Sequence, residues 1–128
     1  MNIEFLKDKS EENFKTGEWA EKKLFYDTAI SRYYYCIYQK IIYISKKKGF
    51  YQEPEKTEDS HKNTIIMFIS ELDSKLSSEE KINILQMKDL RRLRNNSEYR
   101  EIKTKQNDYN LIFKFSFNRI NNIVDKFL

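Results

Sequence analysis

Glycine and proline are scarce in this chain of 128 residues, which contains two glycines and one proline. Tight turns and strand ends depend on these residue types, because glycine adopts backbone conformations that other residues avoid and proline interrupts regular hydrogen bonding. A sheet with many tight connections is therefore disfavoured, and an all-α fold is expected. A chain of this length can bury about two thirds of its unfolded surface, so residues 1–128 are expected to form one packed domain.

Apolar residues recur at spacings of three and four along five segments, which is the period of an amphipathic helix. The segments cover residues 2–15, 18–48, 60–74, 77–96 and a last helix that follows the connector 101–107. Gly17 and Gly49 are expected to end the first and second helices. Ser60 is expected to cap the third helix, and Ser77 with Glu80 forms a capping-box pattern at the start of the fourth.

The last helix has the most regular apolar stripe in the sequence. The stripe consists of Phe113, Phe117, Ile120, Val124 and Phe127. Short connections between long amphipathic helices imply antiparallel neighbours, so we expect an up-and-down bundle of four to five helices. Three consecutive tyrosines at positions 33–35 of the second helix must face different directions, and most of them are expected in the core with their hydroxyls at its rim.

The fourth helix carries apolar residues on two sides. At about 100° per residue, one side forms the expected core stripe, which consists of Ile82, Leu85, Leu90 and Leu93. Ile84 and Met87 lie on the opposite side, in line with Arg91 and Arg94. A side that meets only water needs no apolar residues, so Ile84 and Met87 are expected to contact either the first helix or a second copy of the chain. In a homodimer, two-fold symmetry would place the arginines of both copies beside one groove.

Positive charge is concentrated in residues 88–105, which hold seven basic and three acidic side chains and so account for the net charge of +4 of the whole chain. Concentrated positive charge is typical of a polyanion site, although cations also complement the C-terminus of a helix. Arg91, Arg92 and Arg100 are the candidate RNA contacts in this segment. Arg32 joins them, because an arginine inside an aromatic helix needs a partner, either a carboxylate or a phosphate.

Several chemistries lack the residue sets that they need. The sequence has no glycine-rich phosphate loop and no Ser-His-Asp arrangement, and one histidine with one cysteine argues against a zinc site. No metal and no cofactor are therefore expected. The histidine, His61, has two interpretations: a substitute acid or base that approaches the arginines across the bundle, or an exposed residue in the first turn of the third helix.

The single cysteine, Cys36, cannot form an internal disulfide, which fits a reducing, cytoplasmic location. The N-terminal residues lack the uninterrupted apolar stretch of a signal peptide. The most apolar region, residues 33–44, is interrupted by Gln39 and Lys40. No membrane span is therefore expected.

The stretches AISRYYYCIY, SHKNTIIMF and LRRLRNNSEY occur in this order along the chain. Together they resemble the small stand-alone HEPN-domain proteins, whose central helix reads roughly Ser-Arg-x-Tyr-Tyr and whose later helix ends in Arg, a short gap and Asp-Tyr. The matching residues here are Ser31, Arg32, Tyr34, Tyr35, Arg94, Glu98 and Tyr99. The resemblance covers residues 18–127 and implies a helical bundle that dimerises, often encoded beside a nucleotidyltransferase or another defence component.

Many HEPN proteins are metal-independent RNases that cut single-stranded RNA at a site built from Arg-x4-6-His motifs of both protomers. The resemblance implies that Arg94 stabilises the charged phosphorane, that Asn95 orients the scissile phosphate, and that Tyr99 or His61 handles protons. The sequence departs from the motif because Tyr99 stands where the histidine is expected. A tyrosine with a pKa of about 10 is a poor base at neutral pH unless neighbouring cations lower that pKa.

Two functions are therefore expected. The first is an RNA-binding protein of a prokaryotic toxin–antitoxin or phage-defence system, acting as a metal-independent endoribonuclease through a dimeric arginine-rich groove. The second is a non-catalytic interaction module that binds and regulates a protein partner such as a nucleotidyltransferase or a nuclease. In the second case Ile84 and Met87 would form the docking surface.

Overall fold

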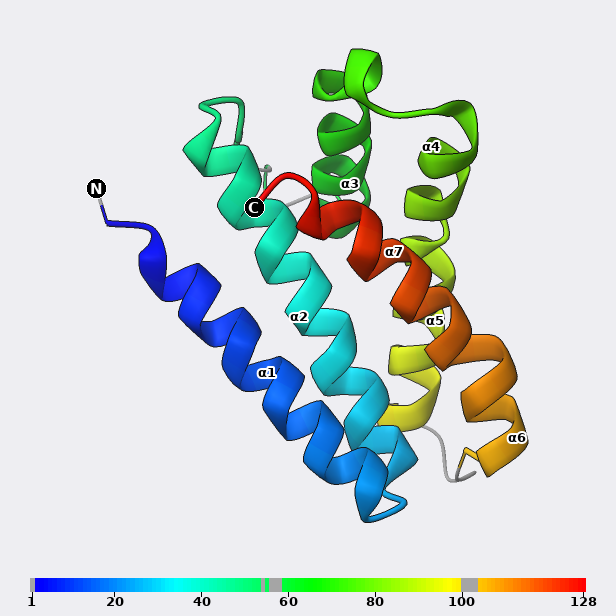
Figure 1. Cartoon of the computed structure of the whole chain (residues 1–128). Coiled ribbons are helices and arrows are strands. Elements are labelled where there is room, and N and C mark those ends of the chain that lie inside the picture. The colour runs from blue at the N-terminus through cyan, green and yellow to red at the C-terminus, as the bar shows by residue number, and fades with distance from the viewer. Residues whose placement is uncertain (1, 54, 56–58, 100–103) are drawn as a thin grey trace.

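The computed structural model describes residues 2–53, 55, 59–99 and 104–128, with the backbone alone for residues 97–99. All regular elements in these residues are helical, and no strand occurs among them, so the expected all-α class is confirmed (Figure 1). The elements are α1 (Glu4–Lys22), α2 (Tyr26–Lys47), α3 (Ser60–Glu71), the 3-10 turn η1 (Asp73–Lys75), α4 (Ser78–Leu85), α5 (Met87–Tyr99), α6 (Gln106–Asp108), the π-helical segment η2 (Tyr109–Lys114) and α7 (Phe115–Asp125).

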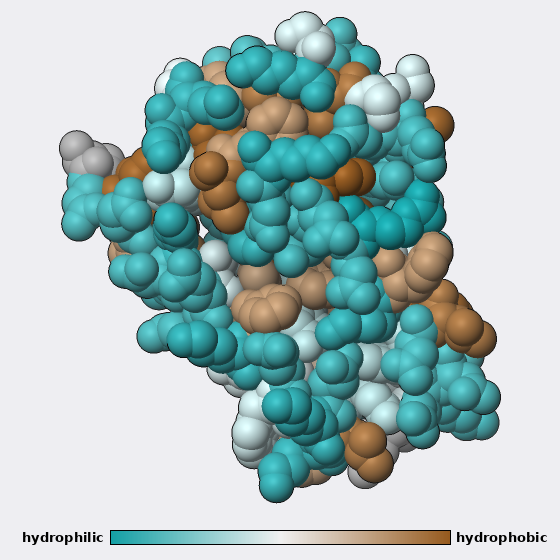
Figure 2. Space-filling view, viewed as in Figure 1, coloured by the Kyte–Doolittle hydropathy of each residue, from teal (hydrophilic) through white to brown (hydrophobic). Residues whose placement is uncertain are grey.

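The central helix of the bundle is α2. It runs antiparallel to α1, and α3, α5 and α7 cover its other sides (Figure 1). A helix that is covered on several sides needs apolar residues on most of its circumference. Its buried apolar side chains are Ala29, Ile30, Tyr33, Tyr34, Cys36, Ile37, Tyr38, Ile41, Tyr43 and Ile44. In Figure 2, which shows the same side of the molecule as Figure 1, hydrophilic residues cover most of the surface.

The three consecutive tyrosines of α2 face three different neighbours, as the sequence predicted. Tyr33 packs on Phe117 of α7, with 4.5 Å between the ring centroids. Tyr34 contacts α3, and the hydroxyl of Tyr35 accepts a hydrogen bond from α5. This helix therefore supplies aromatic groups both to the core and to the side of the bundle where α3 and α5 meet.

The prediction that Gly17 ends the first helix is wrong, because α1 continues to Lys22. Gly17 is instead a point of close approach: a Cβ atom there would lie 2.8 Å from Cδ1 of Tyr33. The chain turns at residues 23–25, where Leu24 has a φ of 64°. Gly49, with a φ of 84°, follows the end of α2 as expected.

The fourth helix begins as predicted, with Ser77 as the N-cap and Glu80 completing the capping box. However, α4 ends at Leu85, and a turn at Gln86 separates it from α5. A projection at 100° per residue holds only within one uninterrupted helix, so the turn changes which residues share a side.

The core stripe that was expected on the fourth helix is confirmed only in α5, where Leu90 is buried and Leu93 packs against the core. Ile84 and Met87 are fully buried in the core of the single chain. Ile82 and Leu85, which were expected to face the core, are 60% and 44% exposed. The prediction that Ile84 and Met87 form a dimer or partner interface is therefore wrong.

The apolar stripe of the last helix is confirmed. Phe113, Phe117, Ile120 and Val124 are buried, and Phe127 packs against the same core. The helical run begins at Gln106 and passes through the π-helical segment before α7. Across the part of the chain that is described, no helix is both long and apolar enough to cross a membrane.

Candidate nucleic-acid interface

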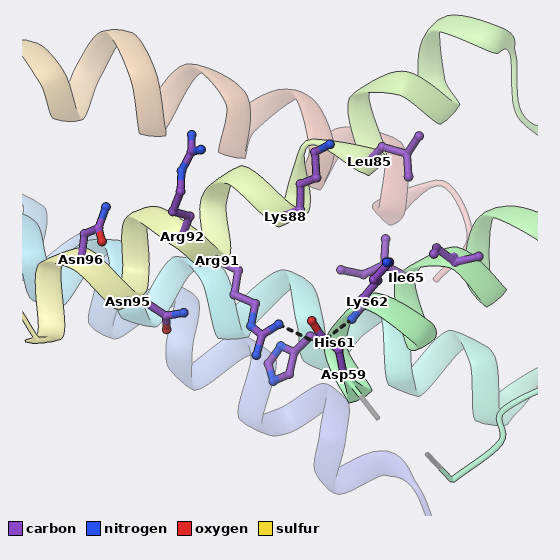
Figure 3. Close-up of a pocket in the computed structure, with 11 residues that line it drawn as sticks. Asp59, His61, Lys62, Ile65, Leu85, Lys88, Arg91, Arg92, Asn95 and Asn96 are labelled. Carbon is purple, nitrogen blue, oxygen red and sulfur yellow. Dashed lines mark hydrogen bonds and ion pairs between the residues drawn. The ribbon is translucent and has the colours of Figure 1, made fainter. Parts of the chain in front are cut away.

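A groove of about 630 Å³ lies between α3 and α5, beside the turn that joins α4 to α5 (Figure 3). Its lining combines four cations, one carboxylate, one imidazole, two amides and three aliphatic side chains. In that order they are Lys62, Lys88, Arg91, Arg92, Asp59, His61, Asn95, Asn96, Ile65, Ile66 and Leu85. Cations outnumber carboxylates among these residues, so the groove attracts anions.

Asp59 links the start of α3 to α5. Its Oδ1 accepts a hydrogen bond from the backbone N–H of Lys62 at 3.2 Å, so Asp59 is the N-cap of α3 in place of the predicted Ser60. The same oxygen accepts a hydrogen bond from Arg91 at 2.7 Å. The Lys62 N–H and then the Arg91 guanidinium lower the pKa of Asp59 below its usual value. Asp59 is therefore a carboxylate held against a groove cation.

His61 lies across the bundle beside the arginines of α5. Its ring stacks on Tyr38 with 4.2 Å between centroids, and its Nδ1 is 2.6 Å from the hydroxyl of Tyr34. Burial, and then the positive charges of Arg91 and Arg94, lower the pKa of His61 to about 4. The imidazole is therefore neutral at pH 7. Of the two interpretations of His61, the structure agrees with the one that brings it to the arginines.

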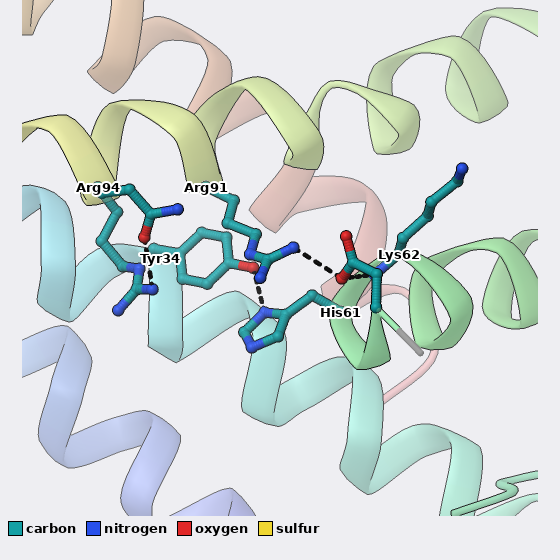
Figure 4. A network of polar contacts seen from close by, with 7 residues as sticks. Tyr34, His61, Lys62, Arg91 and Arg94 are labelled. Atoms are coloured by element: carbon teal, nitrogen blue, oxygen red, sulfur yellow. Dashed lines mark hydrogen bonds and ion pairs between the residues drawn. The ribbon is translucent and has the colours of Figure 1, made fainter. Parts of the chain in front are cut away.

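Arg94 and Asn95 come together, but they face different surroundings. Arg94 donates to Oδ1 of Asn95 at 2.7 Å and to the hydroxyl of Tyr35 at 2.8 Å. Its guanidinium carbon lies 5.5 Å from the ring centroid of Tyr34 and 4.9 Å from that of Tyr35. Figure 4 shows that Arg94 reaches from α5 to α2, whereas Arg91 points toward His61. Asn95 lines the groove, whereas Arg94 packs on the tyrosines behind it.

The other predicted contacts are not all in one place. Arg92 lines the groove with a side chain that is 70% exposed. Arg32 donates to Oδ1 of Asn13 on α1 at 3.3 Å, so it lies on the α1 side of α2 and its partner is an amide. The side chain of Tyr99 and all of Arg100 lie outside the described residues.

Three charged groove residues, Asp59, Lys62 and Lys88, were missed by the sequence analysis, together with Asn96 and the aliphatic lining. Lys62 and Lys88 are exposed lysines on separate helices. They line the same groove only because α3 packs beside α5. Within the residues that the structure describes, no three His, Cys, Asp or Glu side chains gather into a group that could hold a metal ion.

Comparisons with known proteins gave no match to a family model, to a curated protein or to a solved structure. The functional argument therefore depends on the chemistry of the groove itself.

Proposed function

We propose that this chain binds single-stranded RNA in the groove between α3 and α5. One observation carries the proposal: Lys62, Lys88, Arg91 and Arg92 line one groove, and Asp59 is the one carboxylate among its described lining residues. Phosphate contacts by lysine and arginine supply most of the affinity of proteins for nucleic acids. Amides beside the cations add hydrogen bonds to phosphate, sugar or base edges.

The groove favours a single strand over a duplex. Ile65, Ile66 and Leu85 form an apolar part of its lining, and the bases of a single strand can pack against such side chains. In a duplex the base faces are stacked on one another and the phosphates lie outside. A groove that offers both cations and apolar side chains therefore fits unpaired nucleotides.

RNA cleavage without a metal is part of the same proposal, and the resemblance to HEPN proteins of toxin–antitoxin and defence systems supports it. Transesterification needs a base that takes the proton of the 2′-hydroxyl and a fixed cation beside the phosphorane. A neutral His61 can accept that proton as the 2′-oxygen bonds to phosphorus; the P–O5′ bond then breaks, and the leaving 5′-oxygen takes a proton from water. Arg91, which is 2.7 Å from Asp59 and whose charge lowers the pKa of His61, is the groove cation proposed to stabilise the phosphorane charge, with Arg94 behind it.

Binding is tested by fluorescence anisotropy with a labelled single-stranded RNA at salt concentrations between about 50 and 200 mM. Affinity is expected to fall steeply with salt, and each cation removed is expected to reduce the logarithmic salt slope by about 0.7. The double variant Arg91→Ala/Arg92→Ala should therefore lower both the affinity for RNA and the salt dependence of that affinity. Lys9→Ala is the control, because it removes one exposed cation from α1. Equal loss in the control and the groove variant would refute the assignment.

Cleavage is tested with the same RNA in the presence of a chelator. Wild type is expected to produce fragments with cyclic 2′,3′-phosphate ends, and His61→Asn and Arg91→Ala are expected to slow their formation at least tenfold. The Lys9→Ala control should cleave at the wild-type rate. Binding without cleavage would restrict the proposal to RNA binding.

A second candidate function is a non-catalytic interaction module, and the exposed apolar side chains of α4 favour it. Ile82 and Leu85 are 60% and 44% exposed. We propose a second copy of this chain as the partner, since the HEPN resemblance implies a homodimer. Light scattering should then give a dimer mass for wild type and a monomer mass for Ile82→Glu. A wild-type monomer would remove this candidate, and pull-down with a neighbouring nucleotidyltransferase would test the other partner that the resemblance implies.

A further inference from the structure

The groove has two chemically different ends (Figure 3). Leu85 and Ile65 lie at one end, where α3 meets the turn before α5, and Asn95 and Asn96 lie at the other end. Arg91 lies between them, beside Asp59. A ligand that follows α5 therefore passes from an aliphatic surface to a cation and then to amides.

The aliphatic end is open to solvent. Ile66 is 46% exposed and Leu85 is 44% exposed, while Ile65 below them is buried. Aliphatic side chains that stand exposed beside a groove favour a ligand with a flat apolar face. The volume of about 630 Å³ is within the range of sites that hold a small organic molecule.

Arg91, in the middle of the groove, already forms an ion pair with the Asp59 carboxylate of the same chain. Arg91 donates through one terminal nitrogen to Asp59 at 2.7 Å, while its buried Nε has no hydrogen-bond partner. A guanidinium binds a phosphate most strongly when two of its N–H groups donate in parallel. The present contact with Asp59 therefore uses less than the full donor capacity of Arg91, and a phosphate could use more of it.

We propose that this groove binds one nucleotide unit, with the base against Ile66 and Leu85 and the phosphate on Arg91 in place of the Asp59 carboxylate. The inference rests on the proposed RNA binding and specifies what the site recognises: a purine or pyrimidine face together with its phosphate. A nucleotide within an RNA strand and a free nucleotide present the same chemistry to this groove, and the experiments below distinguish the two. Asp59 then acts as a competitor that nucleotide binding must displace.

Asp59→Asn is the informative substitution. Asparagine caps a helix about as well as aspartate, so the start of α3 is retained while the negative charge is removed. Affinity for adenosine 5′-monophosphate should rise about three- to tenfold, because the phosphate no longer competes with a carboxylate for Arg91. Asp73→Asn is the matched control: it removes the same charge from η1, where Asp73 pairs with Lys81. It should leave the affinity unchanged.

The contribution of the base is measured by calorimetry with adenosine 5′-monophosphate and ribose 5-phosphate. Wild type should bind the nucleotide at least tenfold more tightly than the sugar phosphate. Leu85→Ser should remove most of this difference and leave the affinity for ribose 5-phosphate unchanged. Competition by the nucleotide against labelled RNA shows whether the strand uses the same site.

Each outcome has a separate meaning. If wild type binds both ligands equally, or if Asp59→Asn binds the nucleotide no more tightly, the inference is wrong. If RNA binds with the expected salt dependence but the nucleotide does not compete, the nucleotide site is refuted and the proposed RNA binding stands. If the nucleotide binds with the expected response to Asp59→Asn and RNA does not bind, the inference holds for a free nucleotide and the proposed RNA function fails.

Discussion

Lowering the pH from 7.5 to 4.5 should destabilise this protein in a way that depends on its single histidine, His61. The pKa of His61 is about 4 in the folded chain, against about 6.5 for an unperturbed histidine. Between these values the unfolded chain binds the proton and the folded chain does not. The stabilisation linked to His61 is therefore fully present above pH 6.5 and is lost as the pH falls toward 4.

The size of the effect follows from the shift. The difference between the His61 pKa values of the unfolded and folded chain corresponds to about 3 kcal/mol in the free energy of unfolding, at about 1.4 kcal/mol for each pKa unit. The imidazole is only half-buried, so solvent screening reduces the expected loss to about 1–2 kcal/mol. Burial and the charges of Arg91 and Arg94 cause the shift, and Asp59 opposes it.

The assay is urea unfolding of wild type and His61→Asn at several pH values between 7.5 and 4.5. Asparagine places a polar atom near the position of Nδ1 beside Tyr34 but cannot be protonated in this range. Carboxylates titrate in both proteins, so their contribution cancels in the difference. The free energy of unfolding of wild type should fall by about 1–2 kcal/mol more than that of the variant. If the free energy of unfolding falls equally with pH in wild type and His61→Asn, the burial of His61 beside the arginines is refuted.

Three further substitutions test the packing, each by urea unfolding. Phe117→Ala should lower the free energy of unfolding by about 3–5 kcal/mol, because Phe117 is fully buried against Tyr33. A urea midpoint equal to that of wild type would contradict this. Gly17→Ala should destabilise the protein by about 1–3 kcal/mol, since the new Cβ would lie 2.8 Å from the buried Tyr33 ring. This loss should exceed the gain from the higher helix propensity of alanine. A gain in stability would show that the Tyr33 ring can move. Leu24→Gly should stabilise by up to about 1 kcal/mol, because Leu24 is exposed and has a φ of 64°; a loss would mean that its side chain has a packing role.

The parts of the fold that were predicted correctly depend on local signals. The capping box at Ser77 and the positive φ of Gly49 each depend on a few neighbouring residues, and the stripe through Phe117 lies in an unbroken helical run. The errors arose where tertiary contacts override such signals. Gly17 lies inside α1 and leaves room for the Tyr33 ring of α2, and this contact joins two helices that are separate in the sequence.

The apolar residues of α4 were assigned to the wrong sides for a different reason, whereas Leu90 and Leu93 of α5 face the core as predicted. The turn at Gln86 carries no glycine or proline, so no residue there indicates that α4 and α5 are separate helices. Once the helix was taken as continuous, Ile84 and Leu85 were each assigned to the wrong environment. A prediction about a helix side is only as sound as the assumption that the helix is unbroken.

The candidate site was predicted in part. Arg91, Arg92 and Asn95 lie in one groove because Asn95 follows the two arginines by one turn of α5, and this spacing is visible in the sequence. The contribution of α3 was not visible, since Asp59 and Arg91 are far apart in the chain and meet only after folding. No local pattern encodes that meeting.

The central claim is that RNA phosphates occupy the groove beside Arg91. The imidazole of His61 reports on this directly, because the chain has one histidine and that histidine lines the groove. In NMR titrations with single-stranded RNA, the His61 ring signals should shift to saturation, and the pKa of His61 should rise from about 4 as phosphate charge approaches. RNA binding detected by anisotropy while the His61 signals and pKa stay unchanged would place the RNA elsewhere and contradict the account.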